Sequence, residues 1–374
     1  MKERKNIVRS ISCFALSLMT LLVCSSANVV SSTEALATGN ATITETSVTR
    51  TGKSRYAFSE ESVVLQKREG ETFKVLVLPD LQLEENDRAD GEWAKTTNMV
   101  TDLIEETQPN LLILLGDMVW ENATAKTMQD VADFIDSFQI PWAPVFGNHE
   151  GDTQMQVLTG LTKEKIIDIM EKSEYCLFEE GKKEVSGEGN YAVNLVDVSA
   201  QGEESLAWSF ILMDSHGYDI ESGYDHLKKD QISWYAEYIQ KLTILSNKGK
   251  AEETWVTPQS MLFMHIALPE YVTAYDKWVA NGKDANSGYG ERRKTGSEAR
   301  VNSGMFNQIL YSGSTTDVFV GHQHTNDFGV MYKGVWLRYA LKTGPCLGDL
   351  NVMGGTLITI NADNTRTVKN IYKQ

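Results

Sequence analysis

The chain of 374 residues contains few prolines, few cysteines and no apolar run long enough to span a membrane. Its 7 prolines and 28 glycines follow no Gly-x-y period and no heptad array is present, so a collagen-like fold and a coiled coil are excluded. It also lacks a Gly-x-Gly-x-x-Gly or Walker-type loop, so a nucleotide-binding fold is not indicated. The 41% of hydrophobic residues is enough to bury a sizeable core, which excludes wholesale disorder.

Basic residues are scarce as well. The 35 Lys and Arg stand against 51 Asp and Glu, for a formal net charge of -16. A chain this acidic is repelled by a phosphate backbone, so we expect no nucleic-acid-binding surface. If the protein acts on phosphate esters, a local positive charge such as a bound metal must overcome this field.

The first 37 residues are predicted to be a signal peptide. A basic segment at 2–9 precedes an apolar run at 11–23, which is shorter than the roughly 18 residues that a membrane span requires. Small residues allow cleavage after Ala27 or after Ala37, and the second is slightly favoured. A lipoprotein anchor at Cys24 is the alternative, but the preceding Leu-Leu-Val matches it poorly. We therefore expect a protein that is secreted or held in the cell envelope, with no stable membrane span.

The rest of the chain divides into a lead-in segment at 38–70, whose first part is rich in Thr and Ser, and a folded domain at 71–374. Only Cys176 and Cys346 remain there, and two cysteines make no disulfide framework. Whether they pair or are both buried as small apolar side chains stays open at this point.

The domain alternates between strand and helix patterns. Short apolar runs at 73–79, 111–115 and 143–146 are separated by helical spacing at 93–107 and 131–138. Continuous apolar strands of this kind are typical of a parallel sheet covered on both faces. Further strands are predicted at 190–197, 208–213, 260–264, 317–320, 335–341, 355–361 and 366–372, with a helix at about 228–243. We predict an α/β fold of two mixed sheets in a four-layer α/β/β/α sandwich.

Polar side chains collect where these apolar runs end. They are Asp80, Asp117, Asn148, His149, Asp214, His265, His322 and His324. Four of the 6 histidines belong to this set, which a random scatter would rarely produce. In open α/β sheets ligands bind outside the carboxyl ends of the strands, so we expect these side chains to form a site.

The segments that carry these residues resemble the five motifs of the calcineurin-like metallophosphoesterase superfamily. They occur in the expected order as Asp80-Leu-Gln82, Gly116-Asp117, Gly147-Asn148-His149-Glu150, Met264-His265 and Gly321-His322-Gln323-His324. The stretches 265–270 and 321–327 are similar to one branch, the short purple-acid-phosphatase-like proteins. The resemblance covers the chain from about residue 70 to its end.

The resemblance implies a binuclear metal centre. The first metal ion would take Asp80, Asp117 and His324, and the second Asp117, Asn148, His265 and His322. A shared carboxylate allows two cations to lie ~3.5–4 Å apart. Oxygen and imidazole ligands suit two divalent or trivalent ions of iron, zinc or manganese.

The implied activity is hydrolysis of a phosphate ester, most readily a monoester. A hydroxide held between the metals would attack phosphorus, and His149 would protonate the leaving oxygen as general acid. A phosphodiesterase with the same metal site is one alternative. A degenerate metal-binding surface protein is the other.

One position departs from the superfamily pattern. The first motif is usually Asp-x-His, and here Gln82 stands where the histidine is expected. Purple acid phosphatases that lack this histidine compensate with a tyrosine three residues after the bridging aspartate, where this chain has Trp120. Gln82 is then a ligand through its carbonyl oxygen, or water fills the place, and we expect the first metal to be held more weakly. The basic segment 292–294 is either a solvated loop or a contact for substrate phosphate.

Overall fold

The computed structural model describes residues 48–49, 54–150, 153–219, 221, 223–345 and 352–373. All of them belong to one compact unit that spans Glu45–Gln374. The predicted signal peptide at 1–37 and Cys346 lie outside the described residues. The signal peptide therefore stays a prediction, and the pairing of Cys176 with Cys346 stays open. Cys176 is buried.

The smaller of the two main sheets has five strands in the order β16-β15-β3-β4-β5. The strands are β3 (Phe73–Leu78), β4 (Leu111–Leu115), β5 (Trp142–Val145), β15 (Met353–Ile360) and β16 (Arg366–Lys373). β3, β4 and β5 run parallel, whereas β15 pairs antiparallel with β3 and with β16. This sheet is therefore mixed.

The larger sheet has nine strands in the order β1-β2-β6-β7-β10-β12-β14-β13-β11. Its strands are β1 (Val48–Thr49), β2 (Ser62–Arg68), β6 (Tyr191–Val198), β7 (Glu204–Leu212), β10 (Ser260–Phe263), β11 (Gly288–Tyr289), β12 (Thr315–Val320), β13 (Gly329–Tyr332) and β14 (Val335–Tyr339). β7, β10, β12 and β14 run parallel, and antiparallel pairs such as β6 with β7 make this sheet mixed too. A short hairpin of β8 (Tyr218–Asp219) and β9 (Gly223–Tyr224) stands apart.

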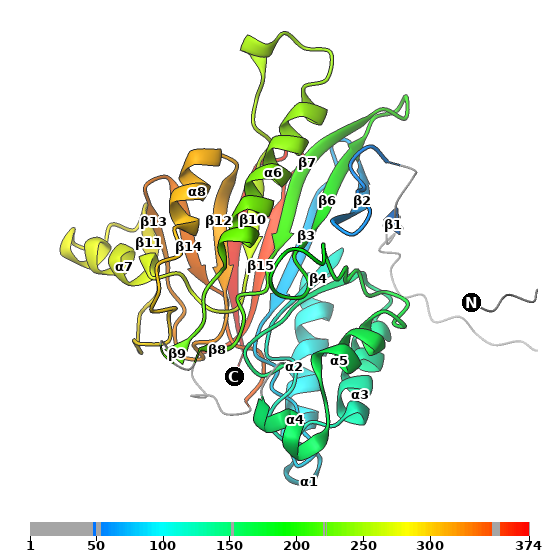
Figure 1. Ribbon diagram of the computed structural model, residues 1–374, viewed down its shortest axis with the longest axis vertical. Helices are drawn as coiled ribbons and strands as arrows, with labels where there is room; N and C mark the ends of the chain where they lie inside the picture. The colour runs from blue at the N-terminus through cyan, green and yellow to red at the C-terminus, as the bar shows by residue number, and fades with distance from the viewer. Residues whose placement is uncertain are drawn as a thin grey trace, which may run out of the picture. The chain divides into compact units, whose positions relative to one another are not determined.

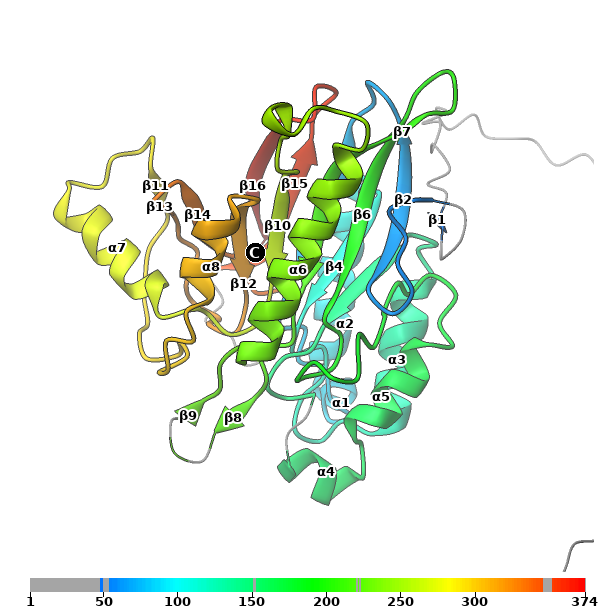
Figure 2. The ribbon, with the colours of Figure 1, turned by 45° about the horizontal axis from the view of Figure 1, so that its top comes forward.

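Two groups of helices cover the outer faces of the sheets. α2 (Glu92–Thr107), α3 (Ala125–Asp136) and α5 (Lys163–Met170) lie together beside β3 and β4 (Figure 1). The second group packs against the larger sheet and consists of α6 (Lys229–Ser246), α7 (Glu270–Ala280) and α8 (Met305–Ser312). Figure 2 shows α6 and α8 in front of this sheet. The remaining helices are α1 (Asp87–Asp90), α4 (Thr153–Thr159) and the 3-10 turn η1 (Glu252–Thr254).

Strand alternation separates the apolar side chains into two cores. In β2, Val63 and Leu65 join the core that contains β3, β4 and the helices α2, α3 and α5, whereas Val64 points to the other face. There it joins Trp234 and Tyr235 of α6 in a second core that also includes α7 and α8. Because successive side chains of a strand point to opposite faces, the larger sheet is buried on both sides. The order of layers is helix, sheet, sheet, helix, and the predicted four-layer α/β fold is confirmed.

Several elements were not predicted. β2 lies inside the segment 38–70 that the sequence suggested as a lead-in, and it pairs in parallel with β6 over its full length. Its apolar part is only three residues long, Val63–Leu65, so the pattern is weak. The helices α5, α7 and α8 were also missed.

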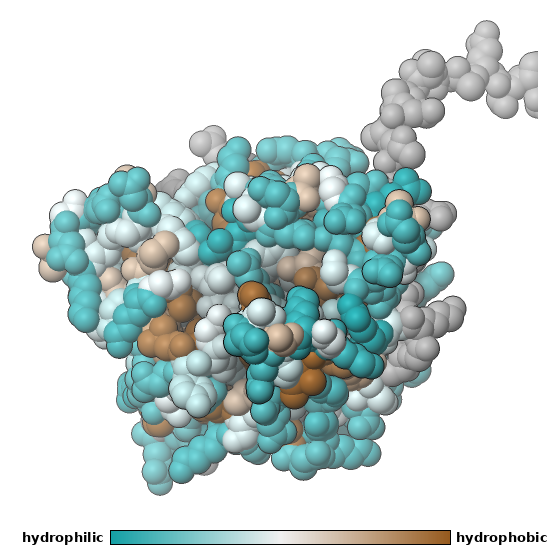
Figure 3. Space-filling view, turned by 90° about the horizontal axis from the view of Figure 1, so that it is seen from above, coloured by the Kyte–Doolittle hydropathy of each residue, from teal (hydrophilic) through white to brown (hydrophobic). Residues whose placement is uncertain are grey.

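The surface is largely hydrophilic. Figure 3 shows one face on which polar side chains dominate and apolar side chains occur in small groups. Within the described part of the chain, no helix combines the length and the apolar character needed to cross a membrane.

Candidate metal centre

The predicted site residues come from both sheets and meet at one edge. Asp80, Asp117 and Asn148 follow β3, β4 and β5 of the smaller sheet. His265 follows β10, and His322 and His324 follow β12, all in the larger sheet. Contacts join the two groups: His265 Nε2 lies 3.1 Å from Asp117 Oδ2, and His324 Nε2 lies 3.6 Å from Asp80 Oδ1. The structure thus assembles residues that are far apart in the sequence.

The backbone at this edge is strained. Asp80, Gln82, Asp117 and His322 all adopt a left-handed conformation, with φ of 57°, 49°, 51° and 68°. Non-glycine residues rarely adopt it, and each such residue costs of order 1–3 kcal/mol. Strain of this kind persists where the surrounding structure enforces it, which is common at functional sites.

Glycines precede site residues because the site has no room for another side chain. A Cβ on Gly147 would lie 2.1 Å from Asp117 Oδ1, and a Cβ on Gly116 would lie 2.4 Å from His265 Nδ1. Both distances are far below a van der Waals contact. The pairs Gly116-Asp117 and Gly147-Asn148 therefore follow from close packing of the site.

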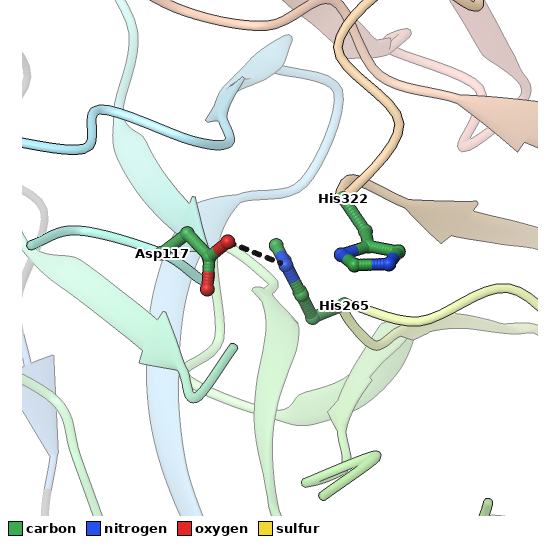
Figure 4. Close-up of side chains that lie close together, drawn as sticks. All are labelled: Asp117, His265 and His322. Carbon is green, nitrogen blue, oxygen red and sulfur yellow. Dashed lines mark ion pairs between the residues drawn. The ribbon is translucent and has the colours of Figure 1, made fainter. Parts of the chain in front are cut away.

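Three of the predicted ligands form the best-defined cluster. One ligand atom each of Asp117, His265 and His322 lies within 4.8 Å of the others (Figure 4). The Nδ1–H of His265 donates to the carbonyl of Leu115, which directs its Nε2 at Asp117. The buried side-chain atoms of the described residues that have no hydrogen-bond partner include two at this site, Asn148 Oδ1 and His322 Nε2. Buried acceptors are rarely left without one, so these atoms fit a metal ion as their partner.

The charges of the cluster favour a cation. Although burial opposes it, the His265 imidazole and the neighbouring His149 hold the pKa of Asp117 far below its ordinary value. Burial lowers the pKa of His265, but Asp117 and Asp80 outweigh it and raise that pKa to about 10, so in the absence of a metal its Nε2 carries a proton, which a bound cation would replace. Burial and His265 together lower the pKa of His322 to about 3, so this ring is neutral and able to coordinate.

The residues predicted for the first metal ion are arranged differently. Both carboxylate oxygens of Asp80 accept the backbone N–H of His322, at 3.2 and 3.1 Å. Burial opposes ionisation of Asp80, yet His324 and His265 lower its pKa. The side-chain NH2 of Gln82 faces Asp117 Oδ2 at 3.5 Å, and its carbonyl oxygen accepts from the buried Lys342 at 2.9 Å. The carbonyl oxygen of Gln82, which was predicted as a metal ligand, thus accepts a hydrogen bond from a lysine.

Glu150 stabilises the two turns that carry Asp117 and Asn148. Its buried carboxylate accepts the backbone N–H groups of Asp117, Met118, Val119 and Gly147, at 2.6–3.3 Å. Burial and the charge of Asp117 raise the pKa of Glu150 to about 7, while the N–H groups favour its ionised form. A cation bound at Asp117 would offset part of that rise. One side chain therefore ties the turn after β4 to the turn after β5.

A pocket of about 550 Å³ opens above the cluster. His149 lies in its wall, with Nε2 3.8 Å from Asp117 Oδ2 and its ring 3.8 Å from the ring of Trp120. The hairpin β8–β9 adds two tyrosines that the sequence analysis did not single out. The hydroxyl of Tyr218 accepts from Asn148 Nδ2 at 2.9 Å, and Tyr224 packs edge-on against His322. The first contact occupies Nδ2 of Asn148, and its Oδ1 is left as an acceptor without a partner among the described residues.

The basic segment 292–294 was predicted to be either a solvated loop or a contact for substrate phosphate, and its residues differ in their positions. Arg293 and Lys294 line the pocket, whereas Arg292 pairs with Asp276. Arg293 is fixed by Asp327 at 2.7 Å and by the carbonyl of Thr325 at 2.9 Å. Of the predicted strand-end residues, Asp214 is not part of the cluster, because it is buried in an ion pair with Lys163 at 2.6 Å.

The chain belongs to the calcineurin-like phosphoesterase family. The family model matches residues 73–326, more than half of the chain and all of the segments that carry the cluster. This family typically binds a dinuclear metal centre, and the Asp117, His265 and His322 cluster stands at the expected place.

Relatives include plant and yeast proteins. The chain is 26% identical over 300 residues to "Probable inactive purple acid phosphatase 28" of Arabidopsis thaliana, an alignment that covers 74% of this chain and 71% of that protein. It is 26% identical over 257 residues to "Probable inactive purple acid phosphatase 29" of the same plant, covering 65% and 62%. It is 27% identical over 344 residues to "Phosphatase DCR2" of Saccharomyces cerevisiae, covering 82% of this chain but only 55% of the yeast protein. The chain is similar to these proteins, and its family membership rests on the family model over residues 73–326.

Two solved structures show a remote similarity. A dimetal phosphatase from Danio rerio aligns with a TM-score of 0.41 at 10% identity, covering 80% of this chain and 99% of that one. The protein TT1561 of Thermus thermophilus aligns with a TM-score of 0.40 at 10% identity, covering 81% and 100%.

Proposed function

We propose that this chain is an exported, metal-dependent phosphoesterase that hydrolyses phosphate monoesters. The observation that carries the proposal is the cluster of Asp117, His265 and His322 beside a pocket that Asp117, His322 and Asn148 line, with Oδ1 of Asn148 buried and lacking a hydrogen-bond partner among the described residues. Export belongs to the proposal because of the basic and apolar segments at 2–23. A bound metal centre would supply Lewis acidity that activates the attacking water and neutralises charge on the phosphoryl oxygens.

The residues around the cluster have separate tasks in this reaction. Asp117 and the two imidazoles hold the cation, and Tyr218 orients Asn148 for the same purpose. Arg293 and Lys294 on the pocket wall attract the anionic group of the substrate into an otherwise acidic protein. His149 is positioned between Asp117 and the pocket, from which its ring is able to deliver a proton to the leaving oxygen.

A monoester is expected to be the better substrate. Its terminal phosphate carries up to two negative charges, so it interacts more strongly than a singly charged diester with a cationic centre flanked by Arg293 and Lys294. We expect kcat/KM to be at least about 10-fold higher for p-nitrophenyl phosphate than for bis-p-nitrophenyl phosphate, which corresponds to about 1.4 kcal/mol. The comparison is made on one preparation, after reconstitution with iron, zinc and manganese in turn. A preference for the diester would replace this proposal by a phosphodiesterase.

The role of His149 predicts a dependence on the leaving group. His149→Ala is expected to lower kcat by about 10²–10⁴-fold for an alkyl phosphate, whose leaving oxygen needs a proton. The loss should be clearly smaller for p-nitrophenyl phosphate, because p-nitrophenolate departs without protonation. His226→Ala is the matched control, since His226 does not line this pocket. Equal losses on both substrates would show that His149 does not act as the general acid.

A second candidate is a metal-binding surface protein without catalysis. Two observations favour it: Gln82 is engaged by Lys342 where the family pattern has a histidine, and two plant relatives carry the word inactive in their names. This candidate predicts bound metal but no hydrolysis of either aryl substrate with any of the three metals.

A further inference from the structure

A buried lysine stands beside the position predicted for the first metal ion. Lys342 lies three residues after β14 and is 2% exposed. Its Nζ donates to the backbone carbonyl of Asp80 at 2.6 Å and to the side-chain carbonyl of Gln82 at 2.9 Å. The peptide unit that follows Lys342 is fixed as well, because Gly354 N–H donates to the carbonyl of Lys342 and Thr343 N–H donates to that of Pro79. The side chain of Lys342 is therefore held at this edge of the sheet.

The lysine determines which way Gln82 faces. An ammonium group only donates hydrogen bonds, so the amide must turn its oxygen toward Lys342 and its NH2 away from it. That NH2 group faces Asp117 Oδ2 at 3.5 Å. A cation between Asp80 and Asp117 would lie next to the side-chain NH2 of Gln82, at the position where the family pattern has a histidine ligand. The one oxygen that Gln82 has for a metal is directed at the ammonium.

The two metal positions are consequently unequal. The second set brings Asp117, His265 and His322 together, and within the described residues both Nε2 of His322 and Oδ1 of Asn148 lack a hydrogen-bond partner. In the first set, both oxygens of Asp80 already accept the backbone N–H of His322, and Gln82 presents donors. The positive charge of Lys342, bound to the carbonyl of Asp80, further disfavours a cation there.

We propose that this chain holds a single metal ion tightly, through Asp117, Asn148, His265 and His322. Lys342 and Gln82 together take the place of the other metal ion of the pair and supply part of its positive charge. This inference rests on the ligand set of the proposed function. It assigns Lys342 and Gln82 as a positioning pair: the lysine orients the amide, and the amide donates to the carboxylate that holds the ion.

The test is metal stoichiometry, measured with Mn²⁺ alone by titration calorimetry and electron paramagnetic resonance. For the wild-type chain we expect one tight site, a second at least about 100-fold weaker, and the spectrum of an isolated Mn²⁺ ion. The double variant Gln82→His with Lys342→Met restores the histidine and removes the ammonium. It should bind two ions within about 10-fold of each other and give an exchange-coupled spectrum. Two equally tight ions in the wild type would overturn the inference, and so would a double variant that folds and still binds one.

Two further variants keep the test decisive. The single variant Gln82→His retains the buried lysine. It replaces the double variant if the double variant fails to fold. In this single variant the affinity of the second site for Mn²⁺ should rise by at least about 10-fold. No change in this variant would contradict the inference. Asn148→Ala should abolish the one tight site. A wild type without any tight site would refute the ligand set itself, and with it both proposals, whereas two tight sites would refute the Lys342 inference only.

Discussion

Replacing Asp117 with asparagine is expected to remove the bound metal and to lower kcat/KM for a phosphate monoester by about a thousandfold or more, which is at least about 4 kcal/mol of transition-state stabilisation. Asp117 is the only carboxylate in the cluster with His265 and His322 within the described residues. Its negative charge is one reason why the pKa of His265 rises to about 10 despite burial. An uncharged amide has neither that charge nor the capacity to hold a cation through both oxygens.

This substitution should leave the fold intact. The backbone N–H of His149 donates to Asp117 Oδ1 at 3.0 Å, and the oxygen of an asparagine is able to accept the same hydrogen bond. The new amide nitrogen would face Nε2 of His265. The substitution removes the main charge that raises the pKa of this ring, and in the neutral ring Nδ1–H donates to Leu115 and Nε2 is an acceptor. The measurements are metal content, steady-state kinetics and a thermal melt. Asp102→Asn, on the exposed side of α2, is the matched control. Wild-type metal content and activity in Asp117→Asn would disprove the site.

Most of the sheet structure was predictable because the buried strands are continuous apolar runs. β3, β4 and β10 are bounded by polar residues and have no competing helical period, so their positions follow from hydrophobicity alone. The rule that ligands bind at the carboxyl ends of parallel strands then located the site. β2 escaped prediction because its burial depends on pairing with β6, which lies more than 100 residues further along the chain.

The ligand residues were predictable for a second reason. Site geometry constrains their neighbours, since Gly116 and Gly147 leave no room for a Cβ, and this produces recognisable short motifs. Lys342 and Tyr218 have no such signature. Lys342 acts through a contact with Asp80 and Gln82 across some 260 residues, and local sequence carries no trace of it. The available signal was a lysine directly after the apolar residues 339–341, because a charged side chain in a buried segment needs a partner elsewhere in the fold.

Glu150→Gln is expected to lower the free energy of unfolding by about 2–4 kcal/mol and the melting temperature by about 4–12 °C. The carboxylate of Glu150 accepts four backbone N–H groups with its two oxygens. A glutamine offers one oxygen, and its amide nitrogen would face N–H groups that are themselves donors. Each buried N–H left without an acceptor costs about 1–3 kcal/mol.

The melt is recorded at pH 6 and at pH 8. Burial and the charge of Asp117 raise the pKa of Glu150 to about 7, so the carboxylate is fully ionised and accepts all four hydrogen bonds only above that value. Because this pKa lies above that of an unfolded glutamate, ionisation lowers the stability of the wild type as pH rises through 7, and its advantage over Glu150→Gln should be smaller at pH 8 than at pH 6. Glu105→Gln, on the exposed side of α2, makes the same chemical change without a buried partner and should shift stability by no more than about 0.5 kcal/mol. Because Glu150 sets the spacing between the turns that carry Asp117 and Asn148, the variant should also bind metal more weakly. A Glu150→Gln protein that melts like the control would mean that the two turns are held by other contacts, such as the N–H of His149 to Asp117.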